Sequence, residues 1–152
     1  MSFSAVTISD IDTPAQTQTV TVTLDNNAKG VFTTSSLTAS GFGGTGPYTF
    51  SGTAAAATTA IRLLMFDPAD NRVAPGATET TAFTISVSDG VASAVTDNST
   101  TVLSTSVNDA PVLDSTKVVS LVAENEDAGA PVNGQAVGTA IESIVDFATP
   151  AG

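Results

Sequence analysis

The chain of 152 residues contains no cysteine, no histidine and no tryptophan. Without cysteine and histidine it has no disulfide, no thiolate nucleophile, no imidazole general base and no zinc site built from those ligands. A Ser-His-Asp catalytic triad is excluded for the same reason. If the chain is secreted, its fold must therefore be held by an apolar core or by ions bound through oxygen.

Basic residues are also scarce. Four Lys and Arg residues stand against 15 Asp and Glu residues, which gives a formal net charge of −11. Such a surface repels nucleic acid and anionic lipid, and metal cations are its natural complement. No stretch approaches the roughly 20 consecutive apolar residues that a membrane-spanning helix requires.

The strongest positive signal is period-two alternation of β-branched residues. Gln18 to Leu24 reads Q-T-V-T-V-T-L, and Thr81 to Ser88 repeats the pattern. This alternation predicts half-buried antiparallel strands whose Thr and Ser hydroxyls face water. The expected core consists of apolar residues from these and other segments: Val20, Val22, Leu24, Phe50, Ile61, Phe83, Ile85 and Val87.

Turn residues separate further short runs that are predicted as strands: Ala5–Ile8, Val31–Thr34, Tyr48–Ser51, Arg62–Phe66 and Thr100–Val107. Thr53 to Leu64 differs, because its apolar residues recur at helical spacing behind a threonine suited to cap a helix. About seven short strands within about 100 residues indicate an all-β chain with an immunoglobulin-like or cadherin-like antiparallel β-sandwich and one short helix. We expect this domain to span residues 1–108.

The composition changes at Asn108-Asp109-Ala110-Pro111, where the proline forces the preceding residue into extended backbone and ends a strand. Residues 109–152 contain one clear strand pattern, at Val118–Val122. About forty residues with a single strand cannot bury a core alone. We therefore expect a linker and the N-terminal segment of a following repeat.

The linker Val107–Val112, with the sequence V-N-D-A-P-V, resembles the one that joins cadherin-like, VCBS-type repeats in giant bacterial surface adhesins and repeats-in-toxin proteins. Val6–Asp12 is similar to the strand of those repeats that ends in an acidic D-x-D pair. The resemblance implies an extracellular, calcium-stiffened stalk or adhesive fibre on the bacterial cell surface, without catalysis. Repeats of this kind begin with a strand directly after the preceding linker, so we expect the repeat at residues 3–110 to lack its first strand.

Several acidic residues are candidates for calcium binding. Calcium takes six to eight oxygen ligands, which carboxylates, amide oxygens and backbone carbonyls supply. Asp and Asn are also favoured in turns that hold no metal, so both interpretations stay open. For Asp67, Asp70 and Asn71 the turn interpretation is favoured, because Pro68 and Asn71 already account for a turn. The candidate ligands are Asp10, Asp12, Asp89, Asn108, Asp109, Glu124, Glu126 and Asp127.

Two short motifs are judged incidental. Gly41–Gly46 formally matches the dinucleotide-binding pattern G-x-G-x-x-G, but a strand pattern follows it where a helix is required, so we expect a hairpin loop. Asn98-Ser99-Thr100 matches a glycosylation sequon, which arises by chance in a chain this rich in Ser and Thr.

Three functions compete at this point. The leading hypothesis is a non-catalytic structural repeat of a secreted adhesin or surface filament that mediates cell adhesion or fibre assembly. The alternatives are a carbohydrate- or matrix-binding module that uses loops such as Gly41–Pro47, and an accessory sandwich domain of a secreted enzyme. The scarcity of aromatic residues, 7 Phe, one Tyr and no Trp, counts against a sugar-binding cleft.

The expected partners are neighbouring repeats or identical subunits. Lys117–Ala123 reads K-V-V-S-L-V-A and is predicted as a strand. In a sandwich that lacks an edge strand, such a segment from another molecule can complete the sheet by main-chain pairing. A head-to-tail contact of this type propagates into a filament. The simpler alternative is a fragment of a longer protein with a frayed tail.

Overall fold

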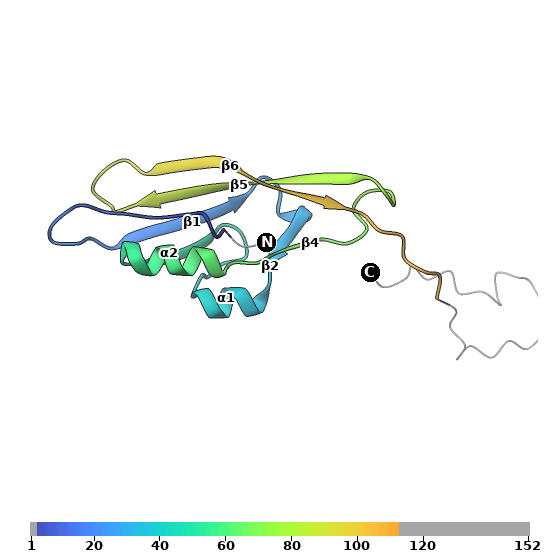
Figure 1. Cartoon of the computed structure of the whole chain (residues 1–152), viewed down its shortest axis with the longest axis horizontal. Coiled ribbons are helices and arrows are strands. Elements are labelled where there is room, and N and C mark those ends of the chain that lie inside the picture. The colour runs from blue at the N-terminus through green and yellow to red at the C-terminus, as the bar shows by residue number, and fades with distance from the viewer. Residues whose placement is uncertain (1–2, 113–152) are drawn as a thin grey trace, which may run out of the picture. The chain divides into compact units, whose positions relative to one another are not determined.

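Antiparallel strands dominate residues 3–112, the part of the chain that the computed structural model describes (Figure 1). The chain divides into two units, Met1–Asn108 and Asp109–Gly152, and the fold described below is that of the first. It contains strands in antiparallel sheets, two short α-helices and one 3-10 turn. In chain order these are β1 (Gln18–Leu24), η1 (Asn27–Lys29), β2 (Gly30–Phe32), α1 (Thr34–Ser40), β3 (Tyr48–Gly52), α2 (Ala54–Leu63), β4 (Phe66–Pro68), β5 (Thr78–Ser88) and β6 (Val95–Thr105).

The larger sheet has the strand order β3-β1-β5-β6, and β2 pairs with β4 in a separate two-stranded sheet. In the larger sheet Val22 of β1 lies opposite Tyr48 of β3 and Ile85 of β5. The alternation in the sequence explains this register, because one face of β1 is apolar and must be buried. The two strands predicted from alternation are confirmed, and β5 begins three residues earlier than expected, at Thr78.

The core lies on the inner face of this sheet. The Phe83 ring is fully buried and packs edge-on against Phe3 and Phe66, with ring centroids 5.5 and 5.1 Å away. Phe32 contributes a third ring, 5.9 Å from Phe83. Phe50 and Val87 are only partly buried and pack against the core. The other six expected core residues are buried: Val20, Val22, Leu24, Ile61, Phe83 and Ile85.

Both helices begin at a threonine cap. The predicted helix is confirmed as α2, in which the Thr53 hydroxyl accepts a hydrogen bond from the Ala56 amide at 3.2 Å. Helix α1 was not predicted, and the strand expected at Val31–Thr34 ends at Phe32. The sequence of α1, T-S-S-L-T-A-S, has low helix propensity, so its pattern does not indicate a helix. The Thr33 cap and the tertiary packing of its buried serines stabilise it instead.

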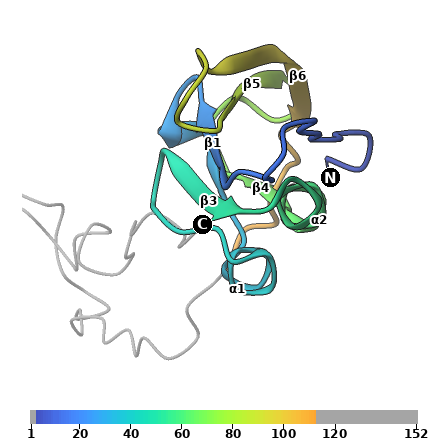
Figure 2. The ribbon, with the colours of Figure 1, turned by 90° about the vertical axis from the view of Figure 1, so that its left-hand side faces the viewer.

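The segment Ala5–Ile8 is not a strand, contrary to the sequence prediction. Its main chain is held by side chains of α2. The Val6 carbonyl accepts a hydrogen bond from Arg62 Nε at 2.8 Å. The Ile8 amide donates to the Thr58 hydroxyl at 2.9 Å, and that hydroxyl donates back to the Ile8 carbonyl. Figure 2 shows this dark-blue segment passing between β6 and α2.

Two further boundaries differ from the prediction. The strand expected at Arg62–Phe66 is β4, displaced to Phe66–Pro68, because α2 continues through Leu63. The strand expected at Thr100–Val107 begins earlier, at Val95, and its register shifts at a bulge near Asp97. The glycine-rich loop Gly41–Pro47 connects α1 to β3, and it folds back as a hairpin-like loop as expected, because Gly43 and Thr49 form an antiparallel bridge with hydrogen bonds of 2.9 and 2.8 Å.

Candidate functional site

Two of the predicted calcium ligands, Asp10 and Asp89, line the same surface hollow of about 330 Å³. Asp10 follows the segment held on α2, and Asp89 follows directly after the end of β5. The two residues are 79 positions apart in the chain, so only the fold brings them to one site. Ser9, Ser88 and Ser93 also line this acidic hollow. The polar groups of the hollow are therefore mainly oxygen ligands, and they stand beside aliphatic residues such as Ile8 and Val87.

Gln18 also lines the acidic hollow and was not predicted as part of a site. It stands first in β1 on the same face as Val20 and Val22, and it is only 4% exposed. A buried amide requires a hydrogen-bond partner. Gln18 Nε2 donates to Asp10 Oδ2 at 2.6 Å. A glutamine on the apolar face of an alternating strand is the sequence signal that could have revealed its role.

The Asp89 carboxylate is fixed by the turn that follows β5. Its Oδ1 atom accepts hydrogen bonds from the Val91 and Ala92 amides, at 2.8 and 2.9 Å. These two bonds lower the pKa of Asp89 below its ordinary value. Asp10 Oδ1 likewise accepts a hydrogen bond from the Asp12 amide at 3.0 Å. The hollow thus holds an ionised Asp89 and an Asp10 carboxylate whose two oxygens are oriented by hydrogen bonds.

The remaining predicted ligands are distributed as follows. Asp12 is exposed next to Asp10 and does not line the acidic hollow. Asn108 closes the first unit and Asp109 opens the second. Within residues 3–112 no group of three or more acidic side chains is arranged to hold a metal ion. Glu124, Glu126 and Asp127 lie outside the described residues.

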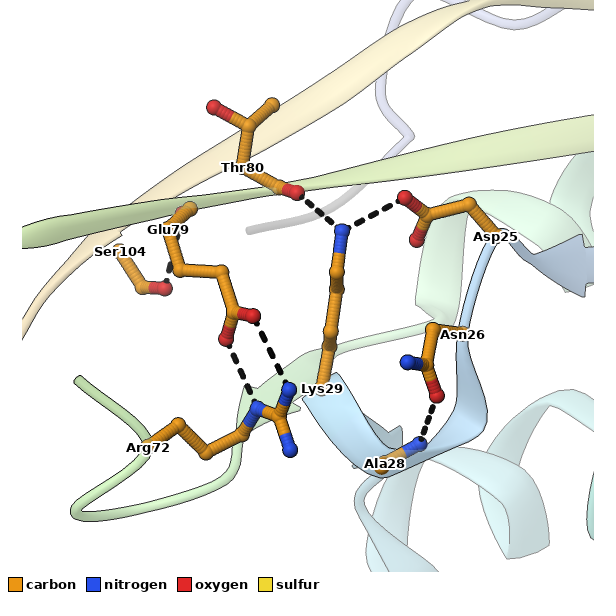
Figure 3. Close-up of polar contacts among 8 residues, drawn as sticks. All are labelled: Asp25, Asn26, Ala28, Lys29, Arg72, Glu79, Thr80 and Ser104. Atoms are coloured by element: carbon orange, nitrogen blue, oxygen red, sulfur yellow. Dashed lines mark hydrogen bonds and ion pairs between the residues drawn. The ribbon is translucent and has the colours of Figure 1, made fainter.

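A second set of charged residues lies at the opposite end of β5 (Figure 3). Arg72 makes a two-pronged ion pair with Glu79, through Nε at 2.9 Å and Nη2 at 3.1 Å. Lys29 donates to Asp25 Oδ2 and to the Thr80 carbonyl, both at 2.7 Å. These contacts fasten the loop before β5 and the turn after β1 to the start of β5. These ion pairs therefore have a structural role and do not form an open binding site.

The Arg72 guanidinium lowers the pKa of Glu79 below its ordinary value. A carboxyl group with a lowered folded-state pKa contributes stability above its unfolded-state pKa and loses it as the pH falls through the folded-state value. We expect the stability difference between the wild type and Arg72→Met to be constant near neutral pH and to shrink below about pH 4.5. Urea unfolding of both proteins between pH 7 and pH 3 measures this difference.

The comparison between two proteins is needed because acid also relieves the repulsion within a chain of net charge −11. That relief acts on net charges of −11 in the wild type and −11 − 1 = −12 in Arg72→Met, so most of it cancels in the difference. A difference that stays constant down to pH 3 would show that the Arg72–Glu79 pair does not couple protonation to folding.

Comparison of the chain with protein-family models, with curated proteins and with solved structures finds no match. Among residues 3–112, neither helix is long and apolar enough to cross a membrane.

Proposed function

We propose that this chain is a non-catalytic structural repeat of a secreted bacterial adhesin or surface filament, and that calcium stiffens it. The fold we propose for residues 1–108 is an immunoglobulin-like or cadherin-like sandwich. The four-stranded antiparallel sheet with a buried inner face and the separate β2–β4 pair are compatible with it. The resemblance of the Val107–Val112 linker to those that join adhesin repeats supports the extracellular location.

The observation that carries the calcium part of the proposal is the acidic hollow. Asp10 and Asp89 line it together. Among residues 3–112, no basic side chain lines the acidic hollow. Carboxylates surrounded by hydroxyl and amide oxygens match the preference of calcium for oxygen ligands. Binding there would join the segment before β1 to the turn after β5, two parts that are far apart in the sequence.

A sugar-binding function receives no support from the described residues. Tyr48 is 3% exposed, and its ring packs against Phe32 with centroids 4.8 Å apart. It therefore belongs to the core. Among residues 3–112 the large apolar side chains exposed on the surface are aliphatic or methionine, as Val91 and Met65 illustrate. A stacking platform for sugars requires exposed aromatic rings.

We expect calcium to raise the melting temperature of the full chain and a chelator to lower it. A ligand that binds only the folded state stabilises it by about 2.7 kcal/mol at one hundred times its Kd. Thermal melts with calcium, with magnesium and with chelator measure the response. Asp89→Asn and Asp10→Asn are each expected to abolish most of the calcium-specific part, because each removes a charged ligand from the acidic hollow.

Asp70→Asn is the matched control, since it removes the same charge from an exposed turn outside the acidic hollow. It should leave the calcium response unchanged. Magnesium separates site binding from general neutralisation of the net charge, because it dehydrates reluctantly and demands octahedral geometry. If calcium and magnesium act equally, or if Asp70→Asn blunts the response as strongly as Asp89→Asn, the acidic hollow is not the calcium site.

A further inference from the structure

A groove runs along one side of the first unit, between β6 and the N-terminal segment. Two adjoining hollows form it, with volumes of about 180 and 400 Å³, and both are lined by Ala5, Val6 and Thr100. Phe83 and Val102 line the smaller hollow, and Val95 lines the larger. We call this feature the side groove. It exposes part of the core that the strands do not cover.

One wall of the side groove is the outer edge of the larger sheet. β6 is the last strand in the order β3-β1-β5-β6 and is 11 residues long. Within residues 3–112 it pairs with β5 alone. Val95 is 75% exposed at this edge, and β6 contains no proline or lysine. Proline and lysine are two of the features that block pairing at such an edge; a bulge is another, and the bulge of β6 is confined to the residues near Asp97, so residues 100–105 keep a regular register.

The other wall is the segment Ala5–Ile8. The carbonyl of Val6 and the amide and carbonyl of Ile8 are bonded to Arg62 and Thr58 on α2. Between them, Thr7 lines the larger hollow. Figure 2 shows this segment passing between β6 and α2, so it faces β6 across the side groove. The polar main-chain groups that the side groove offers to an added strand are those of β6.

We propose that the side groove accepts Lys117–Ala123 of a second copy of this chain as an added β-strand. The pairing would use the main chain of β6, and alternate apolar side chains would fill the hollows. This inference goes beyond the structural role proposed above, because it names the partner and the contact, and it does not depend on calcium.

The sequence of Lys117–Ala123 favours it as the occupant. Within K-V-V-S-L-V-A, Val119, Leu121 and Ala123 recur at every second position and can face an apolar groove together. The other alternating runs of the first unit, in β1 and β5, are already paired on both sides. Lys117–Ala123 therefore combines an apolar face with strand-forming residues. β1 and β5 have both as well, but they have no unpaired side to offer a partner.

Charge also favours this occupant. Asp97 is the one charged residue that lines the side groove. Its pKa lies below the ordinary value because the Ser99 hydroxyl and amide donate to it, so it is ionised. The chain has four basic residues, and three of them already contact acidic or carbonyl oxygens in the first unit: Lys29, Arg62 and Arg72. The fourth, Lys117, begins the proposed strand and is the complement of Asp97.

A contact between the side groove of one copy and Lys117–Ala123 of another joins two different surfaces. Such a heterologous contact does not close on itself unless its rotation happens to form a ring. The expected product is therefore a chain of molecules that lengthens with concentration.

The first test follows the mass of the full chain by light scattering as its concentration rises, with calcium and separately with chelator. We expect the wild type to associate in both. In chelator, Val95→Lys should keep it monomeric, because the new lysine occupies the side groove and repels Lys117. Chelator is used for this comparison because Val95 also lines the acidic hollow. Leu103→Lys is the matched control, since Leu103 is 65% exposed on the same strand but does not line the side groove. It should associate like the wild type.

The second test is complementation between two variants. Leu121→Pro interrupts the proposed strand but leaves the side groove intact, and Val95→Lys does the reverse. Each alone should be monomeric, and an equal mixture should form a complex with the mass of two chains and no more. Asp97→Asn, which removes only the charge partner, should weaken association without abolishing it. Thermal melts establish that each variant is folded.

The proposal is overturned if the wild type stays monomeric at every concentration reached, or if Leu121→Pro associates as the wild type does. The second result would mean that sheet edges pair with each other instead. It is equally overturned if Leu103→Lys and Val95→Lys have the same effect, or if the mixture of monomeric variants forms no complex. If calcium does not change the melting temperature, the results expected for association of the chain stay the same. The calcium proposal and the strand-addition proposal can therefore fail separately.

Discussion

Replacing Phe83 by alanine is expected to lower the free energy of unfolding by about 3–5 kcal/mol, the largest loss for any single side chain of the first unit. The ring is fully buried and contacts Phe3, Phe32 and Phe66. Its removal takes away both the burial of the ring and the edge-on contacts that surround it. Small domains have about 5–15 kcal/mol in total, so this loss is a large fraction of the stability of the first unit. Urea unfolding followed by circular dichroism measures the loss.

Thr84→Ala is the control for Phe83→Ala. Thr84 is the next residue along β5, lies on the opposite face and is exposed. Its replacement should change the free energy of unfolding by about 0.5 kcal/mol or less. Losses of equal size at both positions would mean that β5 is shifted by one residue, because a shift of one exchanges the two faces of a strand.

Gly30→Ala is expected to cause the second large loss. Gly30 begins β2 with φ 152°, a conformation that side chains other than glycine rarely adopt. A Cβ atom there would overlap the Asp67 carbonyl oxygen and lie 2.6 Å from the Phe66 ring. Strained backbone and overpacking each cost about 1–3 kcal/mol. We expect the β2–β4 pair to separate locally, and hydrogen exchange of the Phe32 and Phe66 amides should speed up accordingly.

Gly43→Ala is the control for Gly30→Ala. Gly43 has no heavy atom within 4 Å of the position where a Cβ would stand, and it is not among the glycines with positive φ. Its replacement should leave stability within about 0.5 kcal/mol of the wild type. If both replacements were tolerated, the close approach of β2 to β4 would not exist in solution.

The sequence by itself determined the elements whose signal is local and regular. Val20, Val22 and Leu24 in β1 and Phe83, Ile85 and Val87 in β5 stand at every second position, so the same alternation specifies the strand and its buried face. Helix α2 could be predicted for a similar reason, since Thr53 caps it and its apolar residues follow helical spacing. The acidic residues Asp10 and Asp89 could be named as candidates because carboxylates are calcium ligands in any fold.

Only the tertiary structure decided which distant residues meet. Ala5–Ile8 has the residue types of a strand, but the partners available to its main chain are Thr58 and Arg62 of α2, and so it is not a strand. Helix α1 forms from seven residues of low helix propensity because the surrounding core buries one of its faces. Asp10 and Asp89 share a hollow because β1 and β5 are neighbours in the sheet order. Alternation and propensity act over a few residues, whereas the contacts of Ala5–Ile8 with α2 and of Asp10 with Asp89 join segments 50 or more positions apart, which no local pattern specifies.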